Sequence, residues 1–203
     1  MLEAKGISYQ YQRKSWLFRH VNLTIRPGEI VGLYGKSGAG KTTMAKIMAG
    51  YFKPHEGYVQ VDGHVPSNKE VNPVQLIWQH PEKVINPRWR MKEVIAEVGE
   101  LDPKLLELLG IHHAWLSRRP HELSGGELQR FCLARTLGAQ TKYLIADEIS
   151  TMLDAVTQAQ IWHAVLQQVK ERKIGVLAIS HDHHLLERVS DRIVHFRHLV
   201  TTR

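Results

Sequence analysis

The spacing of hydrophobic and polar positions divides the chain into three stretches. In the first, alternating or short apolar runs end at turn residues such as Pro27-Gly28 and Asp62-Gly63, which is typical of strands. We expect strands at residues 7–11, 21–25, 29–35, 58–63 and 74–78. One segment of this stretch, residues 41–52, has apolar residues three and four apart and predicts a helix.

The other two stretches have different periods. From about residue 86 to residue 137, apolar positions recur at helical spacing. After residue 137 strands and helices alternate, which predicts an α/β fold with a parallel sheet wrapped by helices. The elements expected there are strands at 142–147, 175–180 and 191–196, and helices at 155–173 and 183–189.

The composition is that of one compact domain, residues 1–203. Of 203 residues, 43% are hydrophobic and 23% charged, which is ordinary for a globular protein with a real core. The one cysteine, Cys132, excludes an internal disulfide. No signal-peptide core and no apolar run of about 18 residues is visible. We expect a protein in the cytosol, or one held at a membrane by a partner.

Charge and histidine content do not identify a partner. The net charge is +7, but basic residues are scattered in ones and twos, so we interpret them as solvated surface and expect no nucleic acid. The 13 histidines include the neighbours His112-His113. Adjacent histidines on a helix diverge by about 100° and rarely share one metal ion. We interpret them, apart from His181, as surface residues.

Residues 35–42, GKSGAGKT, match the phosphate-loop pattern G-x-x-x-x-G-K-[ST] between a predicted buried strand and a helix. Backbone NH groups of such loops surround phosphate oxygens. We expect Lys41 to neutralise the β- and γ-phosphates and Thr42 to bind Mg2+. The pattern does not separate a kinase, a GTPase and an ATPase. The expected nucleotide-binding residues are Gly35, Lys36, Ser37, Gly38, Ala39, Gly40, Lys41, Thr42 and Thr43.

Two acids, Asp147 and Glu148, follow the very apolar run YLIA. The carboxyl end of a buried parallel strand lies where such sheets bind ligands. Asp147 is therefore a candidate to hold Mg2+, and Glu148 to orient or deprotonate an attacking water. A glutamate in this place favours hydrolysis over kinase chemistry.

LSGGELQR, residues 123–130, adds a second candidate anion site. Ser124 is a good N-cap, and Gly125 and Gly126 leave backbone NH groups bare at the start of a predicted helix. One nucleotide does not obviously need both this site and the phosphate loop.

Together these residues resemble the ATP-binding cassette (ABC) ATPases over nearly the whole chain, and LSGGELQR is similar to their signature sequence. The resemblance implies a P-loop NTPase core at residues 1–85 and 138–203. This core has a mainly parallel sheet with an N-terminal antiparallel β part, and a helical subdomain is inserted at 86–137. It implies also that two cassettes pair head to tail. The partner's ATP would then contact Ser124, Gly125, Gly126 and Glu127.

The resemblance implies further roles for single residues. Gln79 resembles the Q-loop glutamine, which would sense Mg2+ and the attacking water and couple them to a partner. Asp154 resembles the D-loop aspartate at the dimer contact. His181 resembles the switch histidine that, with Lys41 and Glu148, serves catalysis at the γ-phosphate. Tyr11 is similar to the aromatic that stacks on adenine, and Tyr9 is an alternative.

Three positions depart from the family pattern. Glu127 replaces the commoner glutamine of the signature, Ile149 stands where proline usually follows the Asp-Glu pair, and Met152 replaces a D-loop alanine. These changes affect the expected local geometry. No catalytic group is missing, so the resemblance implies an active ATPase with ATP and Mg2+ as its ligands.

Within the family, Asn86-Pro87 and SGGELQR resemble the ATPases of peptide and nickel import. That group usually has a C-terminal extension, which this sequence lacks. The implied function is to power import from the cytoplasmic face of the membrane, with a like or different ATPase subunit and with integral membrane permeases. The groove around Arg88-Trp89-Arg90 is interpreted as the permease contact. Soluble ABC proteins of translation or DNA repair, and a non-ABC P-loop kinase, are the alternatives.

Overall fold

A five-stranded parallel sheet forms the centre of the molecule. The computed structural model describes residues 1–11, 15–66, 71–78, 80–99, 102–149 and 153–200. Within them, the strand order of the central sheet is β5-β6-β7-β3-β8. Its strands are β3 (Ile30–Tyr34), β5 (Val74–Ile77), β6 (Tyr143–Asp147), β7 (Gly175–Ser180) and β8 (Arg192–His195). The parallel sheet confirms the prediction drawn from the alternation of strands and helices.

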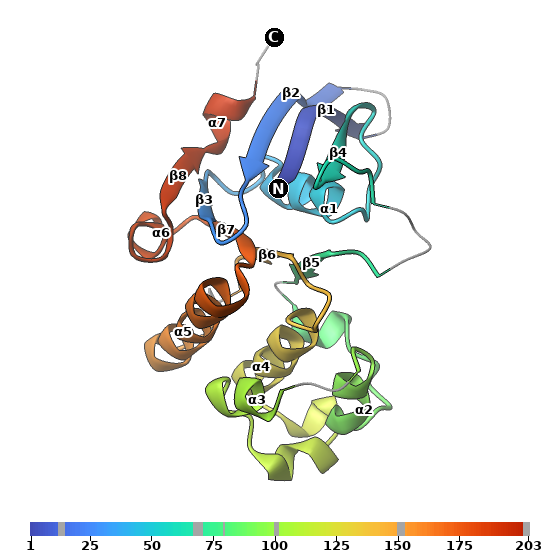
Figure 1. The fold of residues 1–203 in the computed structure, drawn as a ribbon, viewed down its shortest axis with the longest axis vertical. Coiled ribbons are helices and arrows are strands. Elements are labelled where there is room, and N and C mark those ends of the chain that lie inside the picture. Colours follow the sequence, from blue (N-terminus) through green and yellow to red (C-terminus); the bar gives the residue numbers. More distant parts are fainter. Residues whose placement is uncertain (12–14, 67–70, 79, 100–101, 150–152, 201–203) are drawn as a thin grey trace.

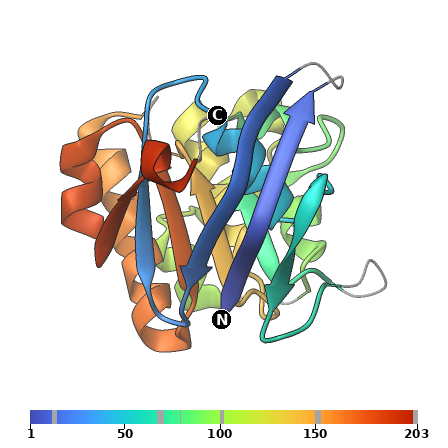
Figure 2. The same ribbon diagram turned by 90° about the horizontal axis from the view of Figure 1, so that it is seen from above.

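A separate antiparallel sheet, of order β2-β1-β4, covers one face of the central sheet (Figures 1 and 2). Its strands are β1 (Leu2–Tyr11), β2 (Ser15–Ile25) and β4 (Glu56–Val61). Strands β1 and β2 are longer than the expected strands at 7–11 and 21–25. The register of β1 against β2 shifts between Ala4 and Ile7. Such a shift breaks the strict alternation that reveals a strand in sequence.

Helices lie on both faces of the central sheet (Figure 1). In Figure 1 the helical segment between β5 and β6 lies below the central sheet, α5 lies beside it, and α1 lies above with the antiparallel sheet. The helices are α1 (Lys41–Met48), α2 (Met91–Ala96), α3 (Pro103–Leu108), α4 (Gly125–Thr136), α5 (Ala155–Arg172), α6 (His183–Val189) and α7 (Phe196–Leu199). The described residues also form three short 3-10 turns, η1 (Pro81–Lys83), η2 (His113–Ser117) and η3 (Pro120–Glu122).

Two hydrophobic clusters form the core, one on each face of the central sheet. On β6, Tyr143 and Ile145 point into the cluster shared with α1 and the antiparallel sheet. The alternate residues Leu144 and Ala146 point into the cluster shared with α4 and α5. Because both faces of the strand are buried, its sequence is apolar throughout and not alternating.

Two predicted elements end earlier than expected. The helix expected at 41–52 ends at Met48, because Gly50 has φ 81°. The Gly50 and Tyr51 NH groups donate to the carbonyls of Ile47 and Lys46, which closes the helix in a Schellman motif. The strand expected at 191–196 ends at His195, and Phe196 begins the short helix α7.

None of the described helices combines the length and the hydrophobicity needed to cross a lipid bilayer. The domain limits at residues 86 and 137 stay a prediction.

Candidate nucleotide site

The phosphate loop connects β3 to α1. Gly38 and Gly40 have φ 78° and 106°, which the loop needs in order to turn its backbone. A Cβ at Gly40 would also lie 3.1 Å from Leu17 Cγ, so β2 approaches the loop closely. Glycine is therefore required at position 40 for both conformation and space.

Lys41 lies inside the loop that precedes it. Its Nζ donates to the carbonyls of Gly35 and Lys36 at 2.7 and 2.9 Å, and the residue is 5% exposed. Burial lowers the pKa of Lys41, while the carboxylates of Glu148 and Asp147 act in the opposite direction. The cation thus faces both acids that the sequence singles out.

Asp147 ends β6 and is buried, with 6% exposure. Burial raises the pKa of Asp147 and the charge of Glu148 adds to this effect, whereas a hydrogen bond from Thr42 and the charge of Lys41 oppose it. Its Oδ1 has no hydrogen-bond partner among the described residues. A buried carboxylate oxygen without a donor is costly, and such an atom is an expected ligand for a cation.

Glu148 follows in a left-handed conformation, with φ 52°. A non-glycine residue held there stores conformational strain, which is common at functional sites. Its NH donates to the carbonyl of Ile179 at 3.0 Å on the neighbouring strand β7. His181 follows the end of β7, and its Nδ1 lies 3.2 Å from Glu148 Oε1. The structure therefore joins two of the predicted catalytic side chains.

One cavity of about 280 Å3 brings several predicted residues together. It is lined by Tyr11, Leu17, Ser37, Gly38, Gly40, Lys41, Thr42, Thr43 and Glu148. Residues from the antiparallel sheet, the loop, α1 and the end of β6 meet there. Leu17 had no functional signal in the sequence, because the expected strand at 21–25 did not reach it.

The two candidate adenine-stacking tyrosines have different surroundings. Tyr9 stacks on Phe52 with ring centroids 5.9 Å apart and contacts Tyr11 edge-on. Tyr11 is 51% exposed, lines the cavity, and its hydroxyl lies 2.9 Å from Thr43 Oγ1. Of the two tyrosines, only Tyr11 therefore lines this cavity.

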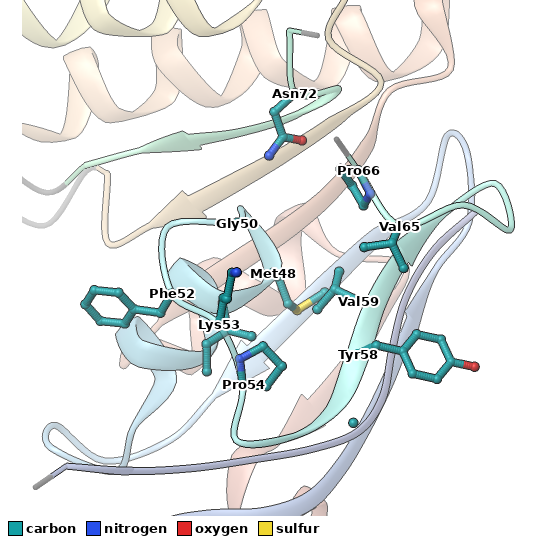
Figure 3. A pocket seen from close by; sticks show the side chains of 12 residues that line it. Met48, Gly50, Phe52, Lys53, Pro54, Tyr58, Val59, Val65, Pro66 and Asn72 are labelled. Atoms are coloured by element: carbon teal, nitrogen blue, oxygen red, sulfur yellow. The ribbon is translucent and has the colours of Figure 1, made fainter. Parts of the chain in front are cut away.

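A different cavity, of about 530 Å3, lies between the end of α1 and β4 (Figure 3). Its wall is mainly apolar, with Met48, Pro54, Val59 and Val65 among its residues. No residue of the phosphate loop lines it. We therefore do not assign it to the nucleotide.

The SGGE segment forms the start of α4. Ser124 is the N-cap: its hydroxyl accepts from the Glu127 NH at 3.3 Å, and Glu127 Oε2 accepts from the Ser124 NH at 2.7 Å. This reciprocal capping box needs Glu or Gln at the fourth position. Glu127 thus preserves the helix start in spite of its departure from the common glutamine.

Neither Ser124 nor its neighbours line the cavity at the phosphate loop. Figure 1 shows α4 in the helical segment, on the opposite side of the central sheet from α1. Asp154 instead is close to α4. It caps α5 by accepting from the NH groups of Val156 and Thr157, and a Cβ at Gly126 would lie 3.3 Å from Thr157 Cγ2.

The remaining positions that the sequence singles out are Ile149, Gln79 and Met152. Ile149 is buried, with 5% exposure, and packs in the cluster shared with α4 and α5. Gln79 and Met152 lie outside the described residues. The part of the chain that the structure describes holds no group of three or more His, Cys, Asp or Glu side chains arranged for a metal ion.

Comparison with known proteins identifies the family. The family model described as ABC transporter matches residues 18–151. The nickel import system ATP-binding protein NikE of Staphylococcus aureus (strain bovine RF122 / ET3-1) is 34% identical over 96% of this chain and 85% of that protein. The chain belongs to the ABC transporter family. The cassette is accordingly an ATP-binding, ATP-hydrolysing transporter subunit, which rules out the non-ABC kinase.

Further comparisons agree. The putative oligopeptide transport ATP-binding protein YkfD of Bacillus subtilis (strain 168) is 36% identical, over 85% of the cassette and 59% of that protein. The dimeric structure of a post-hydrolysis state of the cassette MJ0796 bound to ADP and Pi superposes with TM-score 0.83. It shares 24% identity, over 96% of this cassette and 94% of that chain, and so supports the fold alone. The predicted P-loop NTPase fold is confirmed.

Proposed function

We propose that this cassette powers the import of peptide, nickel or a metallophore. The names of two relatives indicate nickel import and oligopeptide transport for those proteins. The observation that supports its role most directly is the cavity of Tyr11, Lys41, Thr42 and Glu148, with His181 bound to Glu148. A cationic loop faces a strained carboxylate there. That arrangement suits hydrolysis of a phosphoanhydride better than transfer to a second substrate.

In this proposal residues 35–43 hold the phosphates of ATP and Tyr11 stacks on adenine. When ATP binds, the Lys41 ammonium gives up its hydrogen bonds to the loop carbonyls and donates to phosphate oxygens. Mg2+ fits the residues present, because Asp147 Oδ1 is a buried oxygen without a partner and Thr42 supplies a hydroxyl beside it. Bound Mg2+ would neutralise charge on the phosphates. Gln79, outside the described residues, is proposed as a further ligand.

Glu148 and His181 are proposed to act on the attacking water and the γ-phosphate. Glu148 orients the water and accepts its proton. His181 holds Glu148 through Nδ1 and can present its other ring nitrogen to the γ-phosphate. The left-handed backbone of Glu148 fixes where its carboxylate begins, directly after the buried end of β6.

A second cassette is the proposed source of the remaining ligands. The start of α4 lies away from the phosphate loop of its own chain, and its capped, glycine-rich N-terminus is exposed. Bare NH groups and the helix dipole there favour a phosphate. We propose that Ser124, Gly125, Gly126 and Glu127 bind the partner's ATP, and that Asp154 lies at the same dimer contact. The partner is a like or a different ATPase subunit.

The proposed permease contact includes the groove around Arg88-Trp89-Arg90 and the surface around residue 78. Tyr51 is 56% exposed and meets Trp78 edge-on at 5.2 Å, and the Lys46 ammonium lies 5.0 Å from the Trp78 ring centre. Exposed aromatic side chains are typical anchors for a partner. With residues 86–137 as the helical subdomain below this surface, we propose that permeases bind here. The cassette then sits at the cytoplasmic face of the membrane.

Replacing Glu148 by Gln tests the catalytic assignment. ATP binding should persist, since Gln keeps the size of the side chain. Turnover should fall by about a hundredfold or more, as is usual when a catalytic base is lost. Glu107→Gln, at an exposed acid on α3, is the matched control and should retain wild-type turnover. Full hydrolysis in Glu148→Gln would remove Glu148 from this role.

The mass of the Glu148→Gln protein, with and without ATP and Mg2+, tests the pairing. A monomer that becomes a dimer only with ATP would support the sandwich and self-pairing. A monomer that binds ATP but stays single would assign the second signature to a different subunit. Co-purification with the permeases would then be the next measurement.

A further inference from the structure

A cavity of about 500 Å3 lies beside the phosphate loop and apart from the nucleotide cavity. From the loop, this cavity is lined by Gly35, Lys36 and Ala39, whereas the nucleotide cavity is lined by Ser37, Gly38, Gly40, Lys41, Thr42 and Thr43. The remaining lining residues are Leu17, Tyr34, His195, Phe196, Arg197 and Val200. Leu17 is the one described residue common to both linings. The volume is within the usual range for small-molecule sites, about 300–1,000 Å3.

The cavity joins an apolar wall to a cationic one. Leu17, Phe196 and Val200 supply apolar surface, and Phe196 is 2% exposed. Lys36 and Arg197 supply cations, and no described lining residue is acidic. The Lys36 ammonium has no bond among the described residues, and the Arg197 bond goes to His198 at 3.2 Å, which supplies no negative charge. Two cations without a counter-charge favour an anionic group.

Histidine side chains surround the cavity but do not supply its charge. His195 lies between the rings of Tyr34 and His198, at 5.3 Å from each, and His183 lies 6.0 Å away. Burial lowers the pKa of His195, and Arg197, His198 and His183 lower it further. On α6, Glu187 pairs with His183 and His184. The field at the cavity is therefore set by its cations.

The wall of the cavity is in contact with the loop that holds Lys41. A Cβ at Gly35 would lie 3.1 Å from Phe196 Cβ, so the aromatic residue packs directly on the loop backbone. The carbonyls of Gly35 and Lys36 accept the Lys41 ammonium. A molecule that displaces Phe196 or binds the Lys36 side chain would therefore shift Gly35 or Lys36, the two residues whose carbonyls hold Lys41.

We propose that this cavity binds a small organic anion with an apolar body, and that its occupancy changes the affinity of the phosphate loop for ATP. The anionic group contacts Arg197 and Lys36, and the apolar body packs on Phe196, Leu17 and Val200. The coupling rests on the nucleotide site proposed above, whereas the binding itself does not. By linkage, ATP changes the affinity for the anion by the same factor.

The probe for a first test is 8-anilinonaphthalene-1-sulfonate, an aromatic anion, titrated by fluorescence without nucleotide. We expect saturable binding at one site. Arg197→Gln should weaken it about tenfold, the usual loss for one charge-assisted hydrogen bond. Val200→Trp should also weaken it, because the larger side chain occupies part of the cavity. Arg188→Gln, at an exposed arginine on α6 outside this cavity, should leave it unchanged.

Three outcomes would overturn the site. These are no binding to the wild type, equal binding to wild type and Arg197→Gln, and equally tight binding of the uncharged analogue N-phenyl-1-naphthylamine. Circular dichroism of each variant guards against unfolding. In a second titration, dye that saturates the wild type should shift the ATP affinity at least threefold in the wild type and by less in Val200→Trp. An unchanged ATP affinity would overturn the coupling. The first dye titration contains no nucleotide. Its result therefore does not depend on whether the proposed nucleotide site is correct.

Discussion

The buried carboxylate of Asp147 is predicted to lower the free energy of unfolding of the protein. Its carboxylate is buried at the end of β6, and Oδ1 has no hydrogen-bond partner among the described residues. Leaving one buried polar group unsatisfied costs about 1–3 kcal/mol, and more when the group is charged. Asp147→Asn keeps the shape and leaves a polar atom at this place, but it removes the additional cost of the charge. We expect the variant to be more stable by about 1–2 kcal/mol at pH 7, or roughly 3–6 °C in Tm for a chain of this size.

The stability gained by Asp147→Asn should increase as the pH rises. Burial raises the pKa of Asp147, so the folded protein holds this proton more tightly than the unfolded chain. Ionisation therefore costs stability, and the cost grows as the pH rises from the ordinary pKa of an aspartic acid, about 3.9, to the raised value. Below the ordinary value both states are protonated and no cost remains. The difference between Asp147→Asn and wild type should thus be full at pH 7 and small near pH 4.

Urea unfolding at pH 7 and pH 4 measures both points. Glu107→Gln, at an exposed acid, is the control and should stay within about 0.5 kcal/mol of wild type. ATP with Mg2+ should stabilise wild type more than Asp147→Asn, because the carboxylate is then neutralised. A variant that is no more stable than wild type at pH 7, or one whose gain is equal at both pH values, would refute the reasoning.

Three other predictions concern local structure. Ser124→Ala should lose about 1 kcal/mol of unfolding free energy by removing the cap of α4, and Glu127→Gln, which keeps the capping box, should lose almost none. Gly57→Ala should lose about 2 kcal/mol or more, because its Cβ would meet Lys5 O at 2.3 Å. Gly63→Ala, with open space at its Cβ, carries only the φ strain and should lose less. Cys132, whose pKa burial raises to about 12, should resist iodoacetamide at pH 8 in the folded protein and react after unfolding in urea.

The local elements of the site could be predicted because their causes are local. A loop of glycines around Lys41 is encoded within eight residues, and a strand buried on both faces is apolar throughout, which places Asp147 and Glu148 at its end. The N-cap at Ser124 is likewise local, because its capping box with Glu127 spans only four residues. The predictions of helix ends were less accurate. Gly50, for example, closes α1 through backbone hydrogen bonds that depend on its left-handed conformation.

What the sequence by itself determined is therefore the type of fold, the family and the chemistry of the separate segments. The tertiary structure decided which segments meet. Tyr11 and not Tyr9 reaches the cavity because Tyr9 is stacked on Phe52, and His181 meets Glu148 because β6 and β7 are adjacent in the sheet. Strand order and side-chain direction depend on long-range packing, and no local pattern of residues carries them.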